Sequence, residues 1–296
     1  MPRTAKGALT LAEEGPRSPG RRRLGVVVVL ALVAVVGVAG YAGIGYLRAL
    51  ATPEECLVTA AGSTFQWAPD QASNAAAITA IALKRDLPPR AATIAIATAM
   101  QESKVRNITY GDRDSLGLFQ QRPSQGWGTR EQILNPEYST NKFYDALVKV
   151  DGYTTMEITD AAQEVQRSAA GKAYAQHEAQ ARVTASALSG QTHAGAVCVL
   201  EDPQSPGDPQ AVASLIEQDF GVTAEVEGDT VTLRTDDEDL AWAVGSWGVA
   251  RATDTGAVRV VVGDREWRRS MDDSAREWDT TDAPAADAPA VTIHLT

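Results

Sequence analysis

A strongly apolar run near the amino terminus constrains this chain of 296 residues more than any other feature. The run extends from Leu24 to Tyr46, directly follows three arginines, and meets no charge before Arg48. A helix that rises about 1.5 Å per residue would cross a hydrocarbon core of about 30 Å with such a run. A cleaved signal peptide and a retained anchor are the competing interpretations. Because signal-peptide cores hold roughly 7 to 15 apolar residues, the length favours an anchor.

The basic tail gives this predicted anchor a direction. Basic side chains outnumber acidic ones in residues 1–23, so the positive-inside rule keeps the tail cytoplasmic. The sequence therefore predicts a single-pass membrane protein with a transmembrane anchor at residues 24–50. In this prediction the protein contacts the membrane through residues 24–47, and residues 51–296 are extracytoplasmic.

The chain has two cysteines, Cys56 and Cys198. Because an extracytoplasmic environment permits disulfides, we expect them to pair. The alternative is two buried free thiols. His177, His193 and His294 are scattered without the spacing of a ligand set, so the sequence predicts no metal site and no cofactor.

Composition divides the part after the anchor into three segments. Residues 51–200 alternate alanine-rich amphipathic stretches with Gly and Pro clusters, which predicts a helical domain. Residues 201–209 are rich in Pro, Gly and acidic side chains and are typical of a linker. Residues 210–296 predict a small acidic α+β domain in the order helix, hairpin, helix, hairpin, with its first turn at Gly228.

The formal net charge is −11, and most of it lies after residue 200. Binding to phosphate backbones requires clusters of Lys and Arg, so we expect no nucleic-acid partner. The acidic carboxy-terminal domain is instead a candidate docking site for a protein partner.

The helix predicted from about Pro89 to Glu102 is apolar on nearly all sides, yet it ends in a carboxylate. Burial raises the pKa of a carboxyl group and lets it hold a proton near neutral pH, as a general acid must. Cleavage of a glycosidic bond uses such a donor. The alternative is an ordinary solvated helix end, which the adjacent Lys104 would suit.

Glu102-Ser103 is followed by a Gly-Leu-Phe-Gln stretch from Gly117 to Gln120. This pair of motifs resembles the soluble lytic transglycosylases and goose-type lysozymes, families of the lysozyme-like fold. In those families a Glu-Ser ends a buried helix, and Gly-Leu-Met-Gln forms the facing wall of the sugar cleft. The resemblance covers about residues 60–190.

The resemblance implies a role for each matching residue. Glu102 would be the general acid, Ser103 would orient it, and Gln120 would be a polar group at the cleft. Gly117 would let a glycan lie close to the backbone. Trp127, between two glycines, would either stack on a sugar ring or belong to the core.

The chain also departs from the family pattern. The families carry a Tyr-Asn-Ala-Gly motif on a later helix, and the nearest candidate here is residues 165–168, where Gln166 could replace the asparagine amide but tyrosine is missing. Asp112 and Asp114 are the candidates for a second carboxylate that would activate water in an inverting hydrolase. They could equally be loop caps.

The sequence thus predicts a mainly α lysozyme-like domain plus a small α+β domain, behind an N-terminal transmembrane helix. The resemblance implies cleavage of the glycan strands of peptidoglycan. Glu102 alone would act as acid and then base, as in a lytic transglycosylase, with hydrolysis as the other outcome. The rival interpretation is a catalytically inactive lysozyme-like module that binds glycan or organises an envelope complex.

Overall fold

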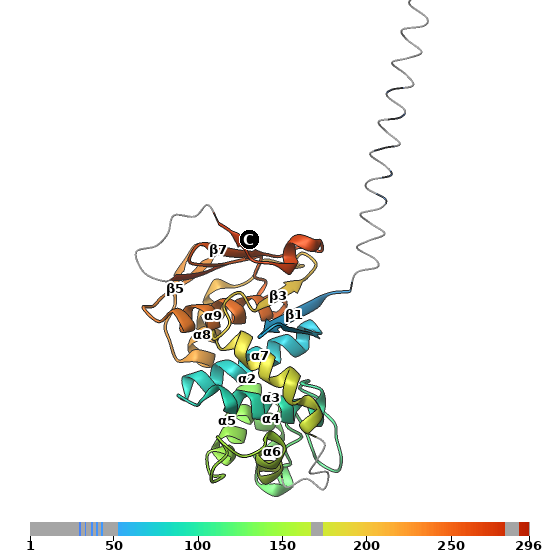
Figure 1. The fold of residues 1–296 in the computed structure, drawn as a ribbon, viewed down its shortest axis with the longest axis vertical. Helices are drawn as coiled ribbons and strands as arrows, with labels where there is room; N and C mark the ends of the chain where they lie inside the picture. The colour runs from blue at the N-terminus through green and yellow to red at the C-terminus, as the bar shows by residue number, and fades with distance from the viewer. Residues whose placement is uncertain are drawn as a thin grey trace, which may run out of the picture. The chain divides into compact units, whose positions relative to one another are not determined.

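The structure is a computed structural model (Figure 1). It describes residues 53–166, 174–281 and 290–295, together with Leu30, Val33, Gly37, Gly40 and Gly43. Glu54–Thr296 forms one compact unit, separate from Met1–Pro53. All elements discussed below belong to the compact unit.

Helices make up much of this unit. The helices are α2 (Pro69–Lys84), α3 (Pro89–Ser103), α4 (Arg130–Ile133), α5 (Pro136–Leu147), α6 (Ile158–Gln166), α7 (Glu178–Leu188), α8 (Pro209–Phe220), α9 (Glu238–Ala250) and α10 (Ala252–Thr255). Short 3-10 turns lie at η1 (Pro123–Gln125), η2 (Ala175–His177) and η3 (Asp273–Arg276).

The strands form two antiparallel sheets. The strands are β1 (Glu55–Ala60), β2 (Ser63–Trp67), β3 (Ala196–Val199), β4 (Glu225–Glu227), β5 (Thr230–Arg234), β6 (Arg259–Val262), β7 (Arg265–Arg268), β8 (Asp279–Thr280) and β9 (Ala290–His294). The first sheet has the order β2-β1-β3, and the second has the order β4-β5-β9-β6-β7-β8.

The first sheet carries the disulfide. Strands β1 and β3 run antiparallel with Cys56 opposite Cys198, and the two sulfurs are bonded across a sequence separation of 142 residues. The predicted pairing is therefore confirmed. The bond links the start of the helical segment to its end.

Helix α3 is the centre of the helical part. Pro88 is its N-cap residue and Pro89 its first helical residue, where a missing amide proton costs nothing. Ile94 and Ile96 are fully buried, because α3 packs against α2, α5, α6 and α7. The helix ends at Lys104, whose φ of 57° is left-handed and whose amide turns back to the carbonyls of the last turn.

Helix α9 joins the two sheets. Figure 1 shows it between the second sheet and the helices α2 and α7, and it contacts α2, β3, β6 and β9. Two glycines permit this close approach: a Cβ on Gly245 would lie 2.4 Å from Val262 Cγ2, and one on Gly248 would lie 3.0 Å from Ile293 Cδ1.

The predicted element order after the linker is found in the structure: α8, the β4–β5 hairpin, α9 and the β6–β7 hairpin. Asp208 caps α8 by accepting from the amides of Gln210 and Ala211, and Gly221 closes the helix with a φ of 74°. The two predicted domains lie within one compact unit.

The predicted fold class is wrong in two respects. The segment expected to be helical also contributes all three strands of the β2-β1-β3 sheet. In the part of the chain that the structure describes, no helix is long and apolar enough to cross a membrane. Crossing takes about 20 apolar helical residues, whereas α2 spans 16 residues and α3 spans 15.

The predicted tail at residues 1–23 lies outside the described residues, and so does the predicted anchor at residues 24–50 except for five scattered positions. The predicted single-pass localisation depended on that anchor, and it is corrected with it.

Candidate active site

Glu102 lies in the last turn of α3 and is half-buried. Burial raises the pKa of its carboxyl group, and a hydrogen bond from Tyr174 lowers it by a smaller amount. The net shift is upward, so the protonated acid persists to higher pH than in an ordinary glutamate. This is the property expected of a general acid.

Tyr174 is the main residue that the sequence analysis missed. Its side chain is fully buried, and its hydroxyl donates to Glu102 Oε1 over 2.7 Å. The tyrosine comes immediately before η2 and not from residues 165–168, where the family pattern was sought. The available signal was that Tyr174 is the one aromatic side chain between Tyr153 and His177, and a tyrosine that is buried usually finds a hydrogen-bond partner for its hydroxyl.

Ser103 fixes the helix end to the facing loop. Its buried hydroxyl lies 2.7 Å from the carbonyl oxygen of Leu118 and accepts from the amide of Arg106 over 3.2 Å. The family resemblance implied that Ser103 orients Glu102, and that role stays a prediction. In the structure these contacts hold the Gly117–Gln120 turn against the end of α3.

The Gly117–Gln120 turn is held by local contacts. Gly117 has a φ of +76°, and a Cβ there would lie 2.8 Å from the carbonyl oxygen of Ile133. Its missing side chain therefore accommodates α4, in addition to any approach by substrate. Gln120 has a φ of 48°, and its Nε2 donates to the carbonyl of Tyr110 over 3.2 Å. A non-glycine residue in the left-handed region is uncommon and often marks a functional loop.

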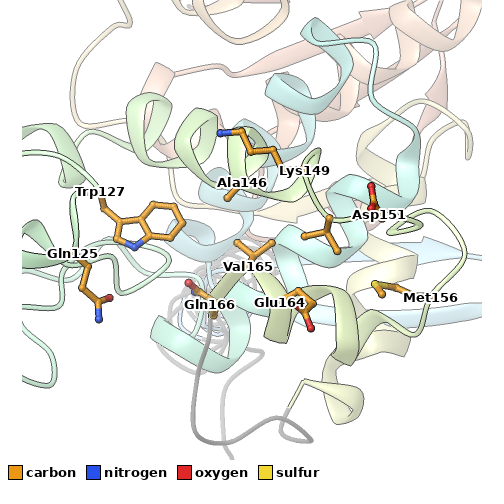
Figure 2. A pocket seen from close by; sticks show the side chains of 10 residues that line it. Gln125, Trp127, Ala146, Lys149, Asp151, Met156, Glu164, Val165 and Gln166 are labelled. Atoms are coloured by element: carbon orange, nitrogen blue, oxygen red, sulfur yellow. The ribbon is translucent and has the colours of Figure 1, made fainter.

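Gln166 connects this turn to a neighbouring cavity. Its Nε2 donates to the carbonyl of Phe119 over 2.8 Å, so the predicted amide does reach the turn that packs on Ser103. Gln166 also lines a cavity of about 870 Å³. Figure 2 shows the Trp127 ring on another wall of the same cavity, extending toward Val165.

The cavity walls mix aromatic, apolar and charged groups. Trp127 is half-buried and packs against the hydrophobic core, while its ring also lines the cavity; stacking on a sugar ring stays a prediction. Charged side chains on the walls come from Lys149, Asp151 and Glu164. A concave surface that combines an aromatic face with a few polar groups suits a polar organic ligand.

The two candidate second carboxylates differ in their surroundings. Asp114 accepts from Arg122 Nε over 2.7 Å, and from the amide and hydroxyl of Ser124 over 2.8 and 3.0 Å. These bonds hold the pKa of Asp114 far below its usual range. The side chain of Asp112 is 93% exposed beside Arg113. Asp114 is thus a structural loop residue, and its ionised form is a weak base.

Within the described ranges, no group of three or more His, Cys, Asp and Glu side chains is arranged to hold a metal ion. No protein-family model matches the chain, and no curated protein matches it.

Proposed function

We propose that this protein cleaves the glycan strands of peptidoglycan, with Glu102 as the general acid. One observation carries the proposal: a half-buried carboxyl group with a raised pKa lies at the end of a buried helix, where Tyr174 donates to it. The Glu-Ser and Gly-Leu-Phe-Gln motifs support it, because Ser103 and the Gly117–Gln120 turn lie against each other.

The site suits a mechanism with one carboxyl group. Protonated Glu102 gives its proton to the glycosidic oxygen as the bond from that oxygen to the sugar C1 breaks. The resulting carboxylate then removes the proton from the 6-hydroxyl of the same sugar, and that oxygen bonds to C1. The product carries a 1,6-anhydro ring, and Glu102 is protonated again.

The surroundings of the aspartates favour this route over hydrolysis. An inverting hydrolase needs a second carboxylate that is free to take a proton from water. Asp114 is engaged by Arg122 and Ser124, and Asp112 faces solvent. Neither Asp112 nor Asp114 is placed as such a base, so we propose the lytic transglycosylase type of reaction.

The neighbouring cavity, whose lining includes Trp127 and Gln166 but not Glu102, is the place we propose for sugars farther along the strand from the broken bond. Trp127 offers a ring face, and Gln166 links the cavity wall to the turn beside Ser103. Sugar rings have apolar faces and polar edges, which matches this combination of groups.

Mass spectrometry of purified peptidoglycan after incubation with the protein tests the proposal. Fragments with 1,6-anhydro ends are the expected products. Reducing ends would overturn the one-carboxyl route and point to a hydrolase. A folded sample that binds glycan strands and releases no fragments would replace the proposal with the non-catalytic binding module.

A further inference from the structure

The residue preceding the proposed acid has its own set of contacts. Gln101 Oε1 lies 3.1 Å from His177 Nε2 and accepts from Gln176 Nε2 over 3.2 Å. Both partners belong to η2. The turn that follows Tyr174 is therefore bonded to Gln101, while Tyr174 itself is bonded to Glu102.

His177 Nε2 lies between two groups: the Gln101 amide oxygen at 3.1 Å and the Gln176 amide nitrogen at 3.4 Å. The tautomer with a proton on Nε2 donates to Gln101, whose oxygen only accepts hydrogen bonds. Partial burial lowers the pKa of His177, which favours the neutral ring near neutral pH. Glu178, the next residue along the chain, pairs with Arg182 on α7, and burial is the cause of the lowered pKa of His177.

The two attachments act on one short segment. Residues 174 to 177 form a single turn, so a side chain at one end restrains the position of the other. His177 and Gln176 both attach this turn to Gln101, with His177 at the shorter distance and half-buried. Released from Gln101, the turn would let the Tyr174 hydroxyl move away from Glu102.

We propose that His177 and Gln101 form a latch that holds Tyr174 on Glu102, which makes His177 a positioning residue for the general acid. This inference rests on the proposed function of Glu102. The latch acts by keeping the hydrogen bond from Tyr174 to Glu102 formed.

The direct test is a titration of the Glu102 carboxyl carbon by NMR in the full-length protein, with Glu102→Gln to assign the signal. The tyrosine hydrogen bond lowers the pKa of Glu102, so His177→Ala is expected to raise it. Tyr174→Phe should raise it in the same direction. Adding His177→Ala to Tyr174→Phe should cause no further change in the pKa of Glu102, because the latch acts only through the Tyr174 phenol.

Two further variants protect this test from a folding artefact. His177→Gln places an amide donor at a similar reach and should restore the wild-type titration. His193→Ala removes a histidine stacked on Trp242 and should leave the titration of Glu102 unchanged. With glycan substrate, His177→Ala should lower kcat roughly threefold to tenfold and leave KM unchanged, as expected for a lost hydrogen bond.

The inference is overturned if the Glu102 titration is the same in His177→Ala and wild type, or if His177→Ala shifts it equally in the Tyr174→Phe background. The titration needs no turnover. A protein that releases no glycan fragments but shows the expected shifts would refute the proposed function and leave the latch standing.

Discussion

The Tyr174 hydroxyl donates a 2.7 Å hydrogen bond to Glu102 Oε1 and so joins residues 72 positions apart in the chain. The bond and the burial of Glu102 act in opposite directions on the same pKa. Burial disfavours the charged carboxylate, whereas a donor stabilises it. A group that must give a proton and then take one back benefits from this balance.

Replacing Glu102 with Gln should stabilise the folded protein near neutral pH. The folded-state pKa of Glu102 is raised, so its contribution to stability is complete below the unfolded value of about 4.3 and is lost as the pH rises through the folded value. We expect the free energy of unfolding of Glu102→Gln to exceed that of wild type by on the order of 1 kcal/mol at pH 7 and to equal it at pH 4. Urea unfolding at both pH values measures it, and equal differences at both would contradict the raised pKa.

Asp114→Asn tests the assignment of Asp114 to the loop. The rate of glycan cleavage should stay within about threefold of wild type, whereas loss of a general base costs roughly 10² to 10⁴. The lowered pKa of Asp114 means that its stabilisation is present above an unfolded value of about 3.9 and fades as the pH falls below it. The backbone amide of Ser124 donates a hydrogen bond to Asp114, so hydrogen exchange at that amide should become faster in the variant. A rate loss of roughly 10² to 10⁴ in Asp114→Asn would instead support the hydrolase mechanism with Asp114 as general base.

Trp127→Ala should weaken substrate binding through the cavity. Partial burial of an aromatic face is worth about 1 to 1.5 kcal/mol, which corresponds to a rise in KM of roughly fivefold to tenfold for a soluble glycan oligomer. Trp127→Phe keeps a ring and should lose less. An unchanged KM with a lower melting temperature would assign Trp127 to the core alone.

Local features were predictable because they depend on a few adjacent residues. Pro89 begins α3, and Asp208 and Gly221 stand at the two ends of α8; capping and proline rules act within one helical turn, so such helix ends can be found from the sequence. The pairing of Cys56 with Cys198 was also predictable, since the chain offers no other partner.

Long-range features were not predictable in the same way. The contact of Tyr174 with Glu102 depends on how α3 packs against the residues that precede α7. Gln166 and Tyr174 both reach the site, but from different segments, so a search for one contiguous motif found only the amide. The prediction of a membrane helix used apolar length alone, and no helix that the structure describes meets that requirement.

Removing the disulfide should destabilise the protein without changing its chemistry. Loss of a crosslink that closes a loop of 142 residues is expected to cost about 2 to 5 kcal/mol of unfolding free energy. Guanidinium unfolding of Cys56→Ser/Cys198→Ser beside wild type measures this. Unfolding of the wild type under reductant gives the same information if the variant does not fold. An unchanged midpoint would show that the bond adds nothing to stability.

The most direct test of the central claim compares the rate of glycan-strand cleavage by wild type and by Glu102→Gln, with binding to insoluble peptidoglycan measured on the same samples. The account predicts a loss of at least about 100-fold in rate, with binding and fold retained. A variant that cleaves as fast as wild type would show that Glu102 is not the acid, and the proposed function would fall with it.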